Sequence, residues 1–438
     1  RITEGIPVQM RYSLNDVPPP AEFVLFGLQW LAISIPGIII IGKVVGGLHF
    51  ADSSSQITYL QKLSFVIGIV LISQVLWGHR LPLILGPSTV LLIGMIASTG
   101  FDRAAVYGSI MVGGGLLFLI AVTGLFGHLQ RLFTPRVVAV VLLLIAFTLM
   151  PTVLGLLVPA GPVPPHRSIS FAFALILGMV VAQRFLPPLW KSAIIFFAMI
   201  AGSLAWFIVF PSPHRQAAAR GLPLVSCFFS GFTTSFSLAP GVLISFLFCF
   251  LGLSINDLGS IESVSTLLDP PHMRQRVNRG IALTGLANLA AGFFGVIGPV
   301  NFSLSPGVIL STGCGARLTL VLTGALLVII SFSPFLMGMI GGVPPVVTGA
   351  ILTYILTFQI AAGLAAIGQE GKAVPVESGI VVGLPVLLGT AISMLTARIL
   401  EAFPLVVRPI IGNGFVVGVL TAFVLEHAIY REKRGTSR

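Results

Sequence analysis

Two acidic side chains lie within an otherwise apolar stretch and could carry proton chemistry. Asp257 and Glu262 occur in SINDLGSIESVSTLLDPP, residues 254–271. Ionisable residues within a membrane span are costly and usually functional. A desolvated carboxylate can take up a proton on one side of a membrane, help to hold a substrate and release the proton on the other side. Asp257 and Glu262 are therefore the proton-coupling candidates of this sequence.

A helical projection separates these two acids. At 100° per residue, Asn256 and Ser260 share a polar face, Glu262 lies at the edge of that face, and Asp257 falls among leucine, isoleucine and valine. The projection favours Glu262 over Asp257 as the acid that faces a polar cavity. The alternative is that both acids lie near the cytoplasmic end of the helix and face the basic residues Arg274, Arg276 and Arg279.

A second polar feature is the stretch GPVNFSLSPGVILSTG, residues 298–313, which is rich in proline, glycine and hydroxyl side chains. Irregular backbone at membrane depth survives only where protein or a water-filled cavity covers it. Its unpaired backbone groups can then bind a polar substrate. The stretch therefore predicts a transporter's binding site, with a structural kink as the alternative.

Composition shows what must position these residues. The chain has 438 residues, of which 56% are hydrophobic and 8% charged, whereas soluble domains carry roughly 25% charged residues. It is therefore a polytopic, all-α membrane protein, whose net charge of +11 reflects membrane topology rather than nucleic-acid binding. The three cysteines have neither metal-ligand nor disulfide spacing. No nucleophile–base pair, metal cluster or phosphate loop stands out, so we expect no enzyme and no cofactor.

Hydropathy predicts fourteen transmembrane segments of roughly 20 residues, two of them short and interrupted. They lie near 22–43, 57–78, 82–99, 103–127, 134–158, 169–185, 190–210, 239–265, 280–297, 302–314, 316–342, 345–366, 375–398 and 402–427. With both termini inside, lysine and arginine are in excess in the inner loops, in agreement with the positive-inside rule. We therefore expect a multi-pass protein of the plasma (inner) membrane with cytoplasmic termini.

Short strings recur at nearly one spacing. Gly86-Pro87 and Gly298-Pro299 are 212 residues apart, and Pro135 and Pro345 are 210 apart. This spacing predicts two repeats of seven spans, the second inverted because seven is odd. The predicted organisation is a cytoplasmic segment 1–21, a first repeat 22–210, an extracytoplasmic linker 211–238, a second repeat 239–427 and a cytoplasmic tail 428–438.

Several strings resemble the nucleobase–ascorbate transporters, which include bacterial uracil and xanthine permeases. The similar strings are YSLNDVPPPAEFVLFGLQWLA (12–32), LGPSTV (85–90), RVNRGIALTGLANLAAGFFG (276–295), PGVILSTG (306–313) and VPPVVTGAILTYILTFQIAAGL (343–364). The resemblance implies a core domain of spans 1–4 and 8–11 and a gate domain of spans 5–7 and 12–14. It also implies short strands in spans 3 and 10, with substrate between them, and a homodimer driven by protons or sodium.

The resemblance also implies site residues. Gln29 has a familiar place in the first span. Either Asn256 or Glu262 takes the family's carboxylate position in span 8, depending on the alignment. Leu304 replaces a polar residue in span 10 and cannot bond a base edge. In the strands and the residues beside them, hydrogen bonds could come from Ser88, Thr89, Asn301, Ser303 and Ser305.

The predicted function is secondary active import of a nucleobase-like heterocycle, of the uracil or xanthine/purine type, by proton symport with an elevator-like movement of the core. One alternative is an anion transporter of related seven-plus-seven architecture. The other is a channel-like uniporter.

Overall fold

The computed structural model describes residues 10–129, 132–187, 190, 194–211, 221–235, 237, 239–302, 305–368, 376–404 and 406–430. The described chain is almost entirely helical, with two three-residue strands. Elements of the first half are α1 (Pro20–His49), α2 (Ser53–Leu76), β1 (Leu85–Pro87), α3 (Thr89–Ala97), α4 (Arg103–Val122), α5 (Phe126–Leu129), α6 (Pro135–Thr148), α7 (Met150–Leu157), α8 (Pro165–Phe185) and α10 (Ile194–Val209).

The second half begins after the linker and repeats the order helix, helix, strand, short helix. Its elements are α11 (Pro240–Leu268), α12 (Met273–Phe294), β2 (Pro299–Asn301), α13 (Ser305–Thr312), α14 (Thr319–Ser331), α15 (Pro334–Gly341), α16 (Pro345–Gly368), α17 (Val376–Ser393), α18 (Ala397–Glu401), α19 (Arg408–Ile411), α20 (Gly414–Val424) and the π-helix η3 (Leu425–Ile429).

In the described part of the chain, eight helical segments are long and apolar enough to cross a membrane. A ninth is obtained if α14 and α15, which are bent by 100° to each other, form one span. The helices α10 and α20–η3 are apolar but shorter. The structure therefore gives a multi-pass helical protein, and the fourteen-span count stays a prediction.

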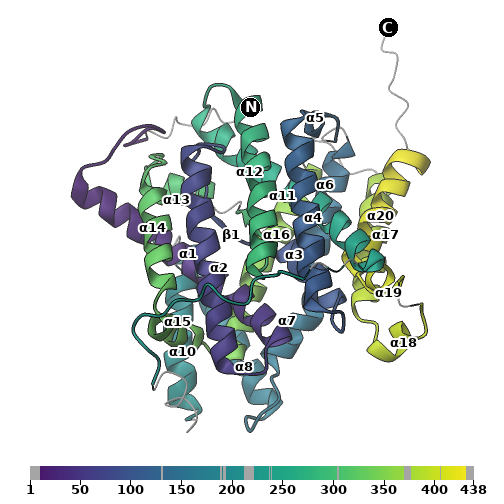
Figure 1. Ribbon diagram of the computed structural model, residues 1–438, viewed down its shortest axis with the longest axis horizontal. Coiled ribbons are helices and arrows are strands. Elements are labelled where there is room, and N and C mark those ends of the chain that lie inside the picture. The colour runs from purple at the N-terminus through teal and green to yellow at the C-terminus, as the bar shows by residue number, and fades with distance from the viewer. Residues whose placement is uncertain are drawn as a thin grey trace.

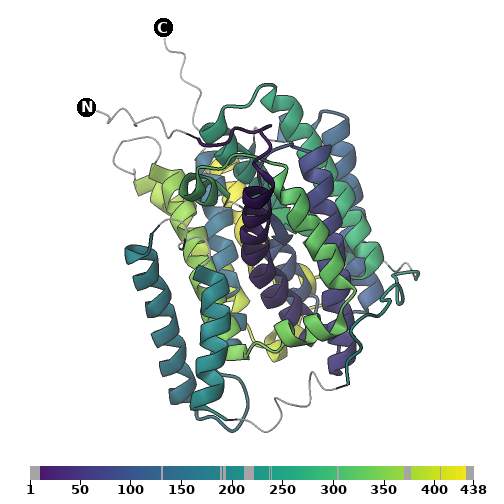
Figure 2. The ribbon, with the colours of Figure 1, turned by 90° about the vertical axis from the view of Figure 1, so that its left-hand side faces the viewer.

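The helices pack in two groups. The strand bundle consists of α1–α4 and α11–α14 around the two strands, and the flanking bundle consists of α6–α8, α10, α16, α17 and α20. Each bundle draws on both halves of the chain, because α12 packs against α4 and α14 against α2, while α16 packs against α6. Figure 1 shows α17 and α20 on the side away from α14, and Figure 2 shows α8 and α10 side by side at one edge.

Small residues allow the close approach within the strand bundle. A Cβ atom on Gly285 of α12 would lie 2.4 Å from the backbone nitrogen of Phe118 and 2.8 Å from the carbonyl oxygen of Gly114 in α4. No side chain fits there, so the two helices meet backbone to backbone. Such small-residue contacts are typical of packing between membrane helices.

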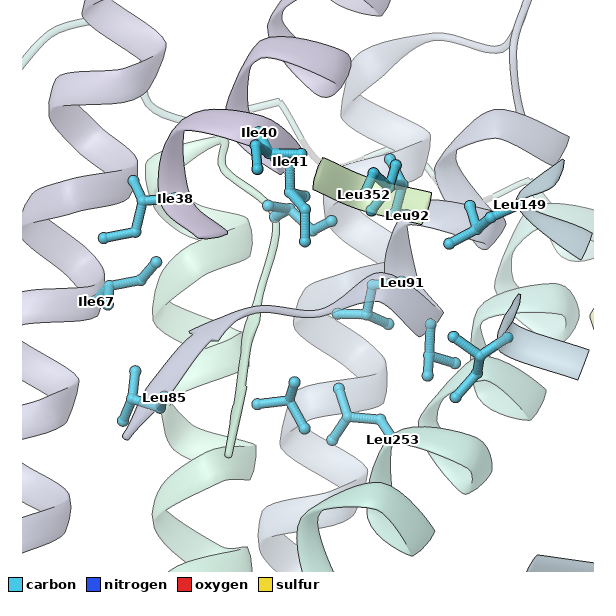
Figure 3. Packing of buried hydrophobic residues seen from close by; sticks show 14 of the residues in the cluster. Ile38, Ile40, Ile41, Ile67, Leu85, Leu91, Leu92, Leu149, Leu253 and Leu352 are labelled. Atoms are coloured by element: carbon cyan, nitrogen blue, oxygen red, sulfur yellow. The ribbon is translucent and has the colours of Figure 1, made fainter. Parts of the chain in front are cut away.

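The two strands lie side by side inside the strand bundle. β1 and β2 pair antiparallel, with Gly86 opposite Val300 and Pro87 opposite Pro299. Thus the two Gly-Pro strings that recur in the sequence lie beside each other in space. All six strand residues are buried, and Figure 3 shows Leu85 and Leu91 among the isoleucines and leucines that surround them.

Candidate functional site

A cavity of about 190 Å³ lies between the strand bundle and the flanking bundle. Its walls come from α1, α3 and α11 on one side and from α10 and α16 on the other, with Phe302 directly after β2. The lining residues are Ile33, Gly37, Ile40, Ile41, Thr89, Ile195, Asn256, Phe302, Leu352, Ile355, Phe358, Gln359 and Ala362.

Three polar side chains are set in this apolar lining: Thr89, Asn256 and Gln359. Each amide carries both a donor and an acceptor, and the two phenylalanines, Phe302 and Phe358, offer ring faces. No charged side chain is among the lining residues in the described part of the chain. The volume is below the roughly 300–1,000 Å³ of pockets that take drug-sized ligands. The cavity therefore suits a small, neutral, planar molecule with hydrogen-bonding edges.

β1 and the helix that follows it, α3, position Thr89 at the cavity. The backbone nitrogen of Ser88 donates to the carbonyl of Gly298, at 2.9 Å, which joins the end of β1 to the residue before β2. The Ser88 hydroxyl then accepts from the nitrogen of Leu91, at 3.2 Å, and caps α3. An N-cap of this kind satisfies one of the free N–H groups at a helix start. Ser88 thus shapes the strand-to-helix turn, and Thr89 lines the cavity.

Asp257 holds the second strand in place. Its carboxylate accepts from the Asn301 backbone nitrogen at 2.9 Å and from the Asn301 side-chain amide at 2.5 Å. The Thr284 hydroxyl of α12 donates to its other oxygen at 2.8 Å. Asp257 is completely buried and makes no salt bridge to a described residue. Hydrogen bonds alone therefore compensate for the burial of this carboxylate.

The hydrogen bonds continue from Asp257 to the end of α2. The Gln74 side-chain amide donates to the Thr284 hydroxyl at 3.0 Å and to the carbonyl of Gly280 at 2.9 Å. The backbone nitrogen of His79 lies 3.4 Å from the Gln74 side-chain oxygen. Burial lowers the pKa of His79 to about 3, so its imidazole is neutral at physiological pH. A polar network thus runs behind the cavity wall from α2 through α12 to β2.

The other residues that the sequence assigned to the site differ in whether they are buried and in what they contact. Ser260 is buried, and its hydroxyl lies 2.8 Å from the Asn256 carbonyl and 3.0 Å from that of Asn301. Ser305 is also buried, and its hydroxyl accepts from the nitrogen of Ile84 at 2.9 Å. Gln29 is half-buried in α1 and is not among the cavity-lining residues. Ser303 and Leu304 lie outside the described residues.

Glu262 occupies a different place from Asp257. It is exposed and lines a separate cavity of about 460 Å³ with Met273 and Arg274, where α11 turns into α12. The helical projection favoured Glu262 as the acid facing the polar cavity, but the buried carboxylate beside the strands is Asp257. The projection did not reveal the position of Asp257, because one face of α11 meets the cavity and another packs against α12 and β2. Asp257 lies on that other face, where its partners are polar groups of α12 and β2.

Some residues of this region were not expected from the sequence. Gln359 lies within the string VPPVVTGAILTYILTFQIAAGL, where it is the only amide. Thr284 and Asn288 are four residues apart in RVNRGIALTGLANLAAGFFG, which places them on one helix face. The Asn288 side-chain amide donates to the carbonyls of Pro299 and Thr284. An amide or hydroxyl in an otherwise apolar span is the signal that could have found them.

Comparisons with known proteins place this geometry in a wider context. The sequence model of the Permease family matches residues 21–398. The chain is 26% identical over 410 residues to the xanthine permease of Bacillus subtilis, with 91% of this chain and 92% of that protein covered. It is 25% identical over 433 residues to the uric acid permease PucK of the same organism, covering 95% and 97% of the two chains.

A solved structure shares the fold. The transmembrane domain of the cyanobacterium bicarbonate transporter BicA superposes with a TM-score of 0.61 at 14% sequence identity, covering 86% of this chain and 98% of that one. At this identity the likeness concerns the fold alone.

Proposed function

The chain belongs to the Permease family, and from this premise we propose that it is a secondary active transporter that imports a nucleobase-like heterocycle. It is a multi-pass membrane permease and not an enzyme, and its resemblance to the nucleobase–ascorbate transporters is confirmed. The relatives named as xanthine and uric acid permeases support a purine-type base as the substrate.

The observation that carries the proposal is the cavity between the bundles. Asn256 on α11 and Gln359 on α16 face it from opposite walls, with Thr89 at the start of α3. A flat heterocycle with alternating donors and acceptors could bond both amides while its faces lie against Phe302 or Phe358. In one of the two alignments Asn256 takes the position for which the resemblance implies a carboxylate, and its amide can both donate to and accept from a base edge.

The chemistry of the lining also favours a nucleobase over an inorganic anion. Anion sites usually gather arginine or lysine around the charge, besides a helix N-terminus such as that of α3, which reaches this cavity at Thr89. The described lining of the central cavity contains no cationic side chain. The related fold of the bicarbonate transporter therefore does not lead us to propose a shared substrate.

We assign proton coupling to Asp257. Its carboxylate is buried, has no ionic partner among the described residues and lies next to Asn256 in the sequence. Protonation would neutralise a charge that is costly in this place, and would change the hydrogen bonds that hold β2. Substrate occupancy and the proton would then act on the same strand. Glu262, in the last third of α11, stays a second candidate.

The movement we infer is a displacement of the strand bundle against the flanking bundle. The strand bundle would be the core domain and the flanking bundle the gate domain, in two inverted repeats of seven spans. The antiparallel pairing of β1 and β2 and the recurring order of elements support this arrangement. The start of α1 and the last helix lie at one end of the molecule (Figures 1 and 2), which suits an even number of crossings with both termini inside. The homodimer stays a prediction.

Uptake into proteoliposomes tests the function. Labelled xanthine, urate and uracil would be offered with an inward proton gradient, with a sodium gradient and with neither. We expect uptake of one nucleobase type, stimulated by the proton gradient, abolished by a protonophore and absent from empty liposomes. Stimulation by sodium alone would overturn proton coupling. Gradient-independent flux would favour the channel-like alternative, and uptake of bicarbonate or sulfate without nucleobase uptake would contradict the proposal.

A further inference from the structure

A second large cavity lies at the end of the strand bundle that is opposite the start of α1. It measures about 460 Å³ and is formed by the first turns of α2, the start of α4, the end of α12 and the linker segment 230–235. Figure 1 shows the teal linker running across α2. None of its lining residues belongs to the central cavity, so it is not a part of the nucleobase site.

A buried lysine points into this cavity. Lys62, in the third turn of α2, is 7% exposed. Its ammonium donates to the carbonyl of Gly231 in the linker at 3.0 Å and lies 5.6 Å from the centre of the Phe232 ring. An ammonium group has three donors, and this carbonyl uses one of them. The other two can bind a further acceptor.

An arginine provides the second positive charge. Arg103, the first residue of α4, places its guanidinium 4.9 Å from the centre of the Phe50 ring. Neither Lys62 nor Arg103 makes a salt bridge within the described residues, although Asp102 also lines the cavity. Lys62 is buried, Asp102 and Arg103 are exposed, and none of the three makes an ion pair with a described residue. A buried charge such as that of Lys62 is normally paired, so an anion bound between Lys62 and Arg103 would compensate for it.

We propose that this cavity binds a small oxyanion, such as phosphate, between Lys62 and Arg103. The Thr233 hydroxyl also lines it and can donate to the same ligand. An oxyanion accepts several hydrogen bonds at once and matches the fork of a guanidinium. The oxyanion can be free in solution or can be the headgroup of an anionic lipid, since both present the same chemistry.

Such a ligand would join three separate parts of the chain. Lys62 belongs to α2, Arg103 to α4, and Gly231 and Thr233 to the linker between the two halves. The bound oxyanion would hold the linker against the strand bundle. It would therefore stabilise the folded protein whether or not a nucleobase is present.

Thermal unfolding of the purified full-length protein tests the site. The probe is sodium phosphate, compared with sodium gluconate at the same ionic strength. A ligand that binds only the folded state raises its melting temperature. We expect phosphate to raise the Tm of the wild type, and the rise to be lost in Lys62→Gln and in Arg103→Gln. The exposed Arg167 of α8 gives the matched control, because Arg167→Gln removes the same charge elsewhere and should keep the rise.

A measurement on the wild type covers the case in which these variants do not fold. Lys62 would be acylated with a lysine-selective reagent, and the modified peptide would be quantified by mass spectrometry. Phosphate at ten times its Kd should slow this acylation about tenfold, since only about a tenth of the sites stay empty. Lys43, which lies in α1 and does not line this cavity, provides the internal reference.

The outcomes separate the sources of the oxyanion. Protection by free phosphate in detergent supports a soluble oxyanion. Protection only in nanodiscs that contain phosphatidylglycerol supports a lipid headgroup. The proposal is overturned if neither slows acylation, or if phosphate raises the Tm of both cavity variants as much as that of the wild type. Nucleobase binding by the same preparations is measured separately, so failure of this site does not bear on the transport proposal.

Discussion

α1 and α11 open the two halves of the chain and face the same central cavity with opposite chemistry. α1 lines the cavity with Ile33, Gly37, Ile40 and Ile41, whereas α11 contributes Asn256. Behind the cavity wall the two halves differ more. β2, the strand of the second half, is hydrogen-bonded to the buried carboxylate of Asp257. β1, the strand of the first half, is held mainly by backbone hydrogen bonds and by the Ser88 side chain.

This difference indicates a division of tasks between two halves with the same order of elements. The first half would set the shape of the cavity, and the second half would supply polar recognition and coupling. The two strands are paired in the antiparallel register, so we expect a change at Asp257 in the second half to reach β1 and Thr89 in the first. Substitutions in α1 and α11 should therefore have different effects.

The largest effect is expected at Asp257. Asp257→Ala leaves the donors of Asn301 and Thr284 without their acceptor, which should lower the free energy of unfolding by roughly 3–5 kcal/mol. Asp257→Asn keeps the size and one acceptor oxygen but cannot ionise. This variant should fold and bind nucleobase but lose proton-driven accumulation, as measured by uptake and by counterflow exchange. Accumulation at the wild-type level in Asp257→Asn would exclude this residue as the coupling group.

The next effect concerns recognition by α11. Asn256→Ala removes a hydrogen bond to the ligand, which is worth about 1 kcal/mol, so KM for uptake should rise roughly five- to tenfold. The Tm of the ligand-free protein should change little. Ser263→Ala on the same helix is the control, because Ser263 is not among the lining residues of the central cavity. An unchanged KM in Asn256→Ala would show that Asn256 does not bind the nucleobase.

A substitution at Gly37 tests whether α1, in the first half, sets the shape of the cavity. A Cβ atom there would lie 3.3 Å from the Phe302 ring, and the further methyl groups of valine would extend into the cavity. Gly37→Val should weaken nucleobase binding about tenfold, equivalent to about 1.4 kcal/mol. Gly47 lies in the same helix with open space around it, so Gly47→Val controls for the helix propensity of valine. Equal binding by both variants would contradict a steric role of α1.

The smallest effect is expected at Glu262, since it lies in the last third of α11 and is exposed. Glu262→Gln should keep proton-driven uptake within about twofold of the wild type, as expected for a surface substitution. Loss of uptake with normal folding would transfer the coupling role from Asp257 to Glu262, as the helical projection suggested.

Much of this architecture could be predicted from the sequence. Composition indicated a polytopic helical membrane protein, and the recurring Gly-Pro strings marked the two segments that form β1 and β2. Hydropathy was less informative about span number, because the short helices after the strands and the bent pair α14–α15 do not have the length of a simple span. The count depends on tertiary packing that allows short helices at membrane depth.

The site was predictable only in part. Thr89 and Asn256 were expected near the substrate and line the cavity. The orientation of Asp257 was not, because its partners Thr284 and Asn301 come from elements that are distant in sequence. Gln359 was also missed, since nothing in its apolar neighbourhood indicates which helix face meets the strand bundle. Long-range contacts determine both positions, and a projection of one helix contains no information about them.

Ligand-induced thermal stabilisation of the purified protein tests the central claim most directly. Wild type, Gly37→Val and Gly47→Val would be compared across xanthine, uric acid, guanine, uracil and small anions, because a selective ligand stabilises the folded state. We predict that one nucleobase raises the Tm of the wild type and of Gly47→Val but not that of Gly37→Val. A rise of the same size in all three proteins would contradict the assignment of the central cavity as the nucleobase site.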